Sequence, residues 1–260
     1  MRSDAVAQWG DPPVDAELRL RFWLVAGATA VGLGASVYVV AFELGQGVAM
    51  RWALGASVIA GFVLVVFGYH LPRNHPPGIP ASSYRSIGVA NSVTLFRGGL
   101  IAGLAGFLLV TPADRLLWAP AVCYALAIGL DWVDGRIARA HDRTTVLGTR
   151  LDMAFDTTGL LVATLVGVLW GRIPVWFIAA PAARYWYRAG VGLRERRGLP
   201  VEELPESVVR RPIAGVQMTF LAVALVPVVP VAVVRGLAVV VLVLVLGIFI
   251  RDYLSVTQRL

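Results

Sequence analysis

The sequence predicts an all-α integral membrane protein, and three observations support that prediction. Hydrophobic residues make up 58% of the 260 residues, and the mean hydropathy is +0.74, which is far too apolar for a soluble domain. The apolar residues are gathered into long runs. The single cysteine, Cys123, lies inside one such run, so we expect neither a disulfide framework nor a thiolate metal cluster.

Eight apolar segments are candidates for membrane-spanning helices, since a helix needs about 20 predominantly apolar residues to cross a bilayer. Pro227 and Pro230 mark the turn between the last two, because proline interrupts the helical hydrogen-bond ladder. The expected segments are 22–42, 51–69, 94–110, 116–130, 152–170, 173–187, 213–229 and 231–250.

The segments fall into three regions along the chain. Residues 1–71 would form a cytoplasmic N-terminus and an accessory two-span hairpin. Residues 72–90 would form a cytoplasmic linker, because this stretch is rich in Pro, Gly and Ser. Residues 91–260 would form a six-span core. The expected fold is therefore a six-helix transmembrane core plus two extra N-terminal transmembrane helices.

Arginine supplies all of the basic charge, because no lysine occurs among the 23 basic residues, and the formal net charge is +7. In a membrane protein such an excess usually marks cytoplasmic loops and contact with anionic lipid, so we expect no nucleic acid partner. The distribution of Arg predicts a multi-pass protein of the cell membrane with both termini in the cytoplasm. The opposite side keeps mainly Arg51, Arg115, Arg172 and Arg235.

Four aspartates lie at the ends of two apolar segments, where isolated charge is costly. Asp131 and Asp134 are three residues apart, and Asp152 and Asp156 are four apart. Each pair would therefore project from one face of a helix. Four converging carboxylates form a hard, all-oxygen site, which suits Mg²⁺ or Mn²⁺ better than zinc. The sequence thus predicts a metal site on the cytoplasmic side.

A structural alternative is a salt-bridge network in which Arg139 or Arg150 neutralises these acids. Four carboxylates exceed what one or two arginines would neutralise, which favours the metal site. The three histidines are scattered rather than spaced as a metal-binding set, so we expect them in loops or interfaces. They are His70, His75 and His141.

The spacing of these residues resembles a known family signature. The pattern D-x-x-D-G-x-x-A-R, eight residues, then G-x-x-x-D-x-x-x-D is similar to that of the CDP-alcohol phosphatidyltransferase family. The chain matches it at Asp131, Asp134, Gly135, Ala138, Arg139, Gly148, Asp152 and Asp156. Upstream, Asn91, Thr94 and Arg97 look like the N-x-x-T-x-x-R element that often precedes the family's first core span.

The resemblance implies metal-dependent transfer of a phosphatidyl or archaetidyl group from a CDP-linked lipid to an alcohol, with release of CMP, in phospholipid biosynthesis. The four aspartates would hold Mg²⁺ or Mn²⁺, two ions in all, and Asp156 would also accept the proton of the attacking hydroxyl. A homodimer is the family expectation. The residues expected to bind the CDP donor are Gly135, Ala138, Arg139, Gly148 and Thr94.

Arginines further along the chain are the candidates for binding the acceptor. A cluster of Arg suits an alcohol that itself carries phosphate, such as glycerol phosphate or inositol phosphate. A neutral alcohol, a serine-type acceptor, or membrane topology alone would leave the same pattern. The segment RRPIAGVQMTF departs from the lysine-containing G-K-x-K-T pattern that some family members have at this place. The candidates are Arg184, Arg188, Arg210 and Arg211.

Two other functions remain open from the sequence. A cation-coupled transporter would also combine many spans with paired intramembrane acids, although carriers seldom need Gly, Ala and Arg at these fixed offsets. A catalytically silent scaffold could keep the fold, but it could lose any of the four aspartates, and all four are present.

Overall fold

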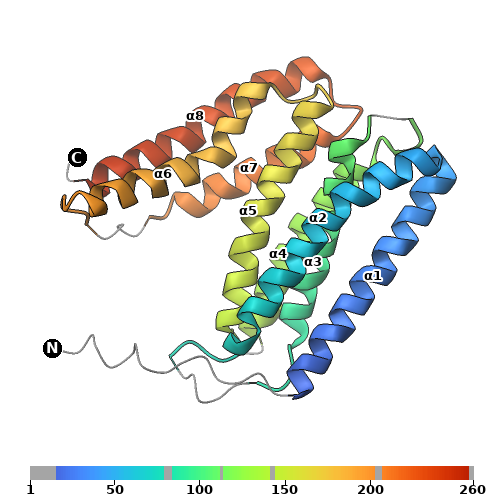
Figure 1. Cartoon of the computed structure of the whole chain (residues 1–260). Helices are drawn as coiled ribbons and strands as arrows, with labels where there is room; N and C mark the ends of the chain where they lie inside the picture. Colours follow the sequence, from blue (N-terminus) through green and yellow to red (C-terminus); the bar gives the residue numbers. More distant parts are fainter. Residues whose placement is uncertain (1–15, 79–83, 112–113, 141–143, 203–206, 258–260) are drawn as a thin grey trace. The chain divides into compact units, whose positions relative to one another are not determined.

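The computed structural model describes residues 16–78, 84–111, 114–140, 144–202 and 207–257. Within these residues the chain forms eight α-helices and four short 3₁₀ helices, with no strand (Figure 1). The side chains of Asp134 and of residues 137–140 lie outside the described part, although the backbone there is helical. The helices are α1 (Ala16–Leu44), α2 (Gln46–His70), α3 (Val89–Gly106), α4 (Ala119–Ala140), α5 (Val146–Leu169), α6 (Ala179–Arg196), α7 (Arg210–Leu225) and α8 (Val231–Val256).

Length and composition confirm an all-α integral membrane protein. In the described part of the chain, five helical stretches are long and apolar enough to cross a membrane, and a shorter apolar helix covers Ala119–Val133. Each of the eight helices overlaps one predicted segment. The five long stretches are Ala16–Leu44, Gln46–Arg73, Val89–Leu109, Val146–Leu169 and Val231–Val256.

Helix α6 is the element that differs most from its predicted segment. The prediction placed a helix over residues 173–187, whereas a 3₁₀ turn occupies Val175–Ile178 and α6 runs from Ala179 to Arg196. Pro174 is extended and precedes that turn, which delays the start of the helix. The C-terminal end of α6 extends to Arg196 because Arg, Leu and Glu favour helix. The predicted segment ends at residue 187 because the apolar run ends there.

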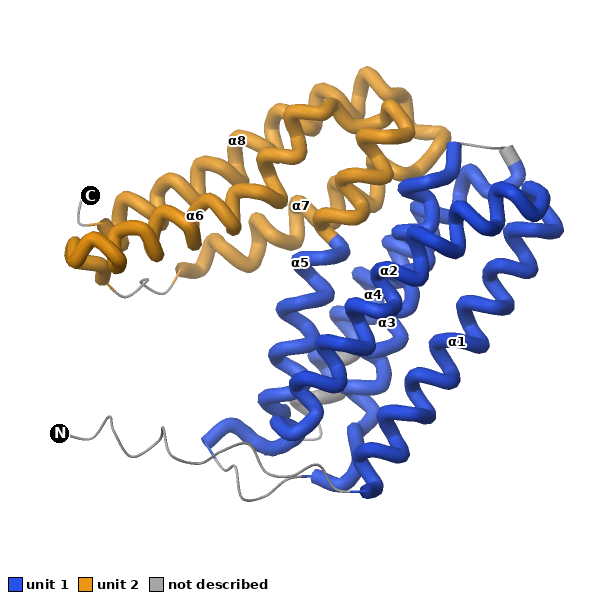
Figure 2. The backbone as a smooth tube through the Cα atoms, in the orientation of Figure 1, with its two compact units in different colours: residues 1–159 blue, residues 160–260 orange. Residues whose placement is uncertain are grey.

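The chain divides into two compact units, Met1–Gly159 and Leu160–Leu260, and the division falls within α5 (Figure 2). The first unit contains α1 to α4 and the first part of α5, and within it α3 packs against both α2 and α4. The second unit contains the rest of α5 with α6, α7 and α8, and α8 packs against α6 and α7. The predicted regions 1–71, 72–90 and 91–260 stay a prediction.

Small residues let α2 and α3 approach closely in the first unit. A Cβ on Gly55 would lie 2.7 Å from the carbonyl oxygen of Ala105, and one on Gly106 would overlap the indole ring of Trp52. Trp52 is buried and its ring meets that of Phe107 edge-on. This is the small-residue packing by which membrane helices come together, and it fixes α2 against α3.

The linker folds against the start of α5. The buried side chain of Asn74 donates hydrogen bonds to the carbonyls of Tyr84 and Ser86, at 2.8 and 3.0 Å. The carbonyl of His75 accepts a 3.0 Å hydrogen bond from the backbone N–H of Val146, the first residue of α5. Because that N–H has no partner within the helix, the linker satisfies it and is tied to α5.

Arg172 holds the turn between α7 and α8 in the second unit. Its Nε donates to the carbonyl of Ala224 at 2.5 Å, and its Nη2 donates to those of Val226 and Val229 at 2.6 and 2.8 Å. The carbonyl of Ala224 lies in the last turn of α7, where helix carbonyls lack partners, and those of Val226 and Val229 come just after the helix ends. One side chain thus closes the C-terminal end of α7 and steadies the turn.

Candidate active site

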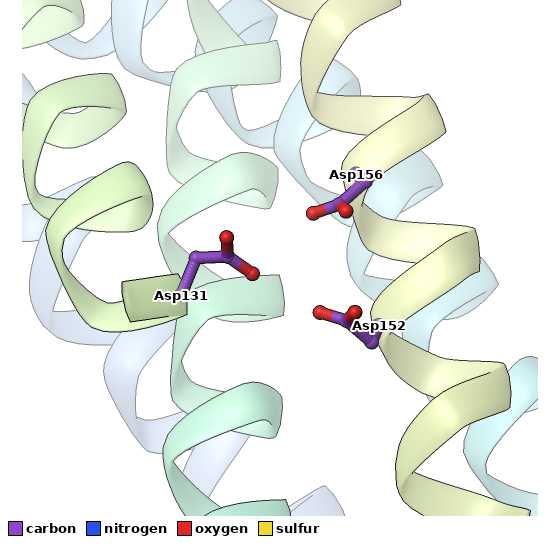
Figure 3. Close-up of side chains that lie close together, drawn as sticks. All are labelled: Asp131, Asp152 and Asp156. Carbon is purple, nitrogen blue, oxygen red and sulfur yellow. The ribbon is translucent and has the colours of Figure 1, made fainter. Parts of the chain in front are cut away.

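Three aspartates from two helices face one another in the first unit. Asp131 lies on α4, and Asp152 and Asp156 lie one turn apart on α5 with their carboxylates directed toward Asp131 (Figure 3). Each offers an oxygen atom, and these oxygens lie within 4.8 Å of one another. All three side chains are half-buried. The four-residue spacing of the α5 pair therefore produces the shared face that the sequence predicts.

A single arginine from α3 enters this cluster. The guanidinium of Arg97 forms ion pairs with Asp131, with Asp152 at 2.7 Å and with Asp156 at 3.2 Å. Arg97 is only 2% exposed, so it is enclosed while the carboxylates keep partial access to solvent. The sequence places Arg97 within the N-x-x-T-x-x-R element, which does not by itself assign it a role. The available signal was a lone charge within the apolar segment 94–110.

The cluster remains strongly negative after this pairing. Among the described side chains, one guanidinium faces three carboxylates, so two negative charges are left over in a half-buried position. Several carboxylate oxygens within reach of one point are the ligands that Mg²⁺ and Mn²⁺ prefer. The residues therefore fit a divalent ion. Arg150, a structural partner considered from the sequence, is exposed on α5.

The start of α5 is joined to α3 by a buried polar network. Thr145 precedes α5, and its hydroxyl accepts hydrogen bonds from the N–H of Gly148 at 2.9 Å and from the side chain of Asn91 at 3.1 Å. Asn91 also donates to the carbonyl of Ile87 at 2.9 Å. Thr145 thus acts as the N-cap of α5. This network sets the register of α3 against the helix that carries Asp152 and Asp156.

Gly148 has a packing role at this junction. A Cβ at this position would lie 2.5 Å from Oδ1 of Asn91 and 3.2 Å from the hydroxyl of Thr145. The side chain of Asn91 packs directly against Gly148, and α3 and α5 can approach this closely only because the residue at 148 is small. The expectation that Gly148 also leaves room for the CDP donor stays a prediction.

The other expected donor-binding residues occupy α3 and α4. Thr94 is buried, and its hydroxyl donates to the carbonyl of Ala90 at 3.0 Å. Gly135 is half-buried on α4. The side chains of Asp134, Ala138 and Arg139 fall outside the described part of the chain, as does all of His141. His75 is buried in the linker.

The expected acceptor-binding arginines all belong to the second unit. Arg184 is half-buried, and Arg188 and Arg211 are exposed. The Nε of Arg210 donates to Oδ2 of the buried Asp252 at 2.6 Å, and Arg251 donates to Oδ1 of the same carboxylate at 2.8 Å. Asp252 was not expected from the sequence. It orients Arg210 and ties the start of α7 to the end of α8.

Helices long enough to cross a membrane, together with a half-buried acidic cluster, define an integral membrane protein with a polar site on its helices. A family model described as CDP-alcohol phosphatidyltransferase matches residues 87–250. The chain belongs to the CDP-alcohol phosphatidyltransferase family, as its aspartate motif indicates.

The curated relatives are named as enzymes that make phospholipids. A CDP-diacylglycerol–glycerol-3-phosphate 3-phosphatidyltransferase of Yersinia enterocolitica is 35% identical over 94 residues, which cover 35% of this chain and 48% of that protein. A protein of Mycobacterium tuberculosis (strain H37Rv), named as a candidate cardiolipin synthase, is 30% identical over 106 residues, which cover 41% of this chain and 49% of that protein. The chain spans about half the length of the curated relatives it matches. No solved structure matches it significantly.

Proposed function

We propose that this protein transfers a phosphatidyl or archaetidyl group from a CDP-linked lipid to an alcohol and releases CMP. The observation that carries the proposal is the convergence of Asp131, Asp152 and Asp156, within 4.8 Å, in a chain of this family. Together with Asp134, these residues would hold Mg²⁺ or Mn²⁺, two ions in all. Such ions, when bound, supply positive charge that stabilises the pyrophosphate oxygens during transfer.

The chain's own residues would position the substrates and move one proton. The carboxylate of Asp156 takes the proton from the acceptor hydroxyl. The hydroxyl oxygen bonds to the phosphorus that carries the lipid, and the bond from that phosphorus to the CMP oxygen breaks. Arg139 binds a donor phosphate by charge-assisted hydrogen bonds. The donor would further contact Thr94, Gly135, Ala138 and Gly148.

The acceptor that we propose is a phosphorylated alcohol such as glycerol phosphate or inositol phosphate. The name of the Yersinia relative includes glycerol 3-phosphate, which supports an acceptor of this kind. Arg bonds to phosphate through two parallel N–H groups, so the candidate residues are Arg184, Arg188, Arg210 and Arg211. We further propose a homodimer in the cell membrane, with both termini and the site on the cytoplasmic side.

The test is release of CMP by the purified protein in lipid. The donors are CDP-diacylglycerol and its archaeal ether analogue, and the panel of acceptors includes glycerol phosphate, inositol phosphate, serine and neutral polyols. We expect CMP release with one donor and one phosphorylated acceptor, only when Mg²⁺ or Mn²⁺ is present. No release under any combination would overturn the proposal. It would also reopen the cation-coupled transporter, against which family membership argues.

A further inference from the structure

Arg97 makes an unusual set of contacts for a buried arginine. It comes from α3, whereas its three carboxylate partners come from α4 and α5. Its Nη2 also approaches the backbone carbonyl of Asp152 at 3.4 Å. Its Nε is buried and has no hydrogen-bond partner within the described residues. The guanidinium is therefore committed to the acidic cluster on one side only.

The oxygens that Arg97 contacts belong to the same carboxylates that would bind a divalent ion. Arg97 pairs with Asp131 Oδ1, Asp152 Oδ1 and Asp156 Oδ1, and these three residues form the group that could hold a metal among the described side chains. A carboxylate oxygen that accepts a charge-assisted hydrogen bond has less electron density to offer a metal. The two kinds of cation therefore exclude or weaken each other at this site.

The backbone beneath Arg97 is fixed. A Cβ on the neighbouring Gly98 would lie 3.0 Å from both Phe155 and Val63, so α3 lies tightly between α5 and α2 at this level. If an ion displaces the guanidinium of Arg97, the side chain must rotate, because the tight packing at Gly98 prevents α3 from moving away. Rotation about side-chain bonds is fast and needs no unfolding.

We propose that Arg97 holds Asp131, Asp152 and Asp156 together and competes with a divalent ion for their oxygens. This proposal rests on the metal site of the proposed function. It makes Arg97 a positioning residue whose charge weakens metal binding and stabilises the metal-free protein. A purely structural salt bridge would contribute to stability without any effect on metal affinity.

The experiment measures metal affinity and stability, without turnover. Binding of Mn²⁺ to the purified protein is followed by the electron paramagnetic resonance signal of free Mn²⁺, and thermal unfolding is recorded in EDTA and in Mn²⁺. The variants are Arg97→Gln and Arg97→Lys. The matched control is Arg150→Gln, because Arg150 is exposed on α5, two residues before Asp152.

For Arg97→Gln we expect Mn²⁺ to bind about tenfold more tightly, the order expected when one charge-assisted hydrogen bond stops competing. The variant should unfold at a lower temperature than wild type in EDTA and recover most of the difference in Mn²⁺. Arg97→Lys should bind Mn²⁺ a few-fold more tightly, because an ammonium keeps the charge but lacks the planar fork with which the guanidinium contacts carboxylates on both helices. If Arg97→Gln does not fold, Arg97→Lys decides.

Arg150→Gln should change Mn²⁺ affinity by less than about twofold, because an exposed charge is screened. Unchanged or weaker Mn²⁺ binding in the Arg97 variants would overturn the proposal. So would an equal gain in Arg150→Gln, since the effect would then be general electrostatics. A wild type that binds Mn²⁺ in this way but never releases CMP would sink the proposed function and leave the role of Arg97 intact.

Discussion

The three carboxylates of the cluster lie close together, but we expect their substitutions to affect different properties of the site. We propose that Asp156 accepts the proton of the acceptor hydroxyl. Replacing it with Asn keeps the size of the side chain and removes its ability to accept that proton. We expect Asp156→Asn to lower the rate of CMP release by about 10²–10⁴, the usual contribution of a positioned general base.

The control for this prediction is a carboxylate outside the cluster. Glu195 is exposed on α6, so Glu195→Gln should release CMP at the wild-type rate. Should Asp156→Asn retain more than about a tenth of wild-type activity in saturating Mn²⁺, the base would have to be another group. Mn²⁺ binding by the variant should weaken but persist, because Asp131 and Asp152 remain.

Gly148 offers a second test at single-residue scale. In Gly148→Ala the new methyl group would lie 2.5 Å from Oδ1 of Asn91, and Asn91 is held by its bonds to Ile87 and Thr145. We expect a loss of about 1–3 kcal/mol in the free energy of unfolding, the cost of breaking a buried hydrogen bond, measured by denaturant titration in detergent.

A glycine with free space supplies the comparison for Gly148. Gly129 lies on α4, and a methyl group added there would have nothing within 4 Å, so Gly129→Ala should be neutral or slightly stabilising, by up to about 1 kcal/mol. Removing the obstructing amide in the double variant Gly148→Ala with Asn91→Ala should recover part of the loss. Equal behaviour of Gly148→Ala and Gly129→Ala would contradict the packing role.

At the scale of elements, the contact between α2 and α3 joins the N-terminal hairpin to the helix that carries Arg97. Gly106→Val would drive a side chain into the ring of the buried Trp52. Overpacking of this kind usually costs about 1–3 kcal/mol, so we expect a lower unfolding temperature and faster proteolysis between α2 and α3.

Gly103→Ala is the matched control for Gly106→Val. Its new methyl group would meet Trp52 at 3.9 Å, an ordinary van der Waals distance, and stability should not fall. If Gly106→Val also left stability unchanged, the hairpin would be only loosely attached to α3.

The turn between α7 and α8 depends on one side chain. Arg172→Gln would leave the carbonyls of Ala224, Val226 and Val229 without their shared donor. We expect about 1–3 kcal/mol lower stability and earlier proteolytic cleavage near residues 226–230, seen by mass spectrometry. Arg235→Gln, at an exposed position on α8, should behave as wild type, and equal cleavage of both would contradict the role of Arg172.

At the scale of the whole molecule, the distribution of Arg predicts which ends of the helices face the cytoplasm. In a Cys123→Ser background, Thr111→Cys should react with a membrane-impermeant maleimide added outside intact cells. Leu199→Cys should react only after the membrane is opened. Both positions are exposed in loops, so access depends on the side of the membrane. The reverse pattern would invert the proposed orientation.

Much of the architecture followed from patterns that act along the chain. Apolar length predicts a spanning helix wherever it lies, and a four-residue spacing places Asp152 and Asp156 on one face without knowledge of the fold. The aspartate motif likewise led to the correct family. These features were predictable because each depends on neighbouring residues only.

Features that depend on which helix faces which were not predictable. The role of Arg97 requires that its face of α3 meet α4 and α5, and the pairing of Arg210 with Asp252 joins residues 42 positions apart. The polar C-terminal half of α6 was not predicted for another reason. Apolar content indicates where a helix lies in the membrane, but a helix can continue beyond the apolar residues. The roles of these side chains therefore depend on packing between distant helices, which the local sequence pattern does not determine.

The hydrogen bonds of the linker determine where this protein can be shortened. A chain cut at the predicted border of the core, residue 91, would lose Asn74 and His75, and Val146 would lose the carbonyl that closes the first turn of α5. The helix that carries Asp152 and Asp156 would then begin with the N–H of Val146 unsatisfied, although Thr145 would still cap Gly148. A truncated version intended for biochemistry should therefore start before Leu71, although the family match begins only at residue 87.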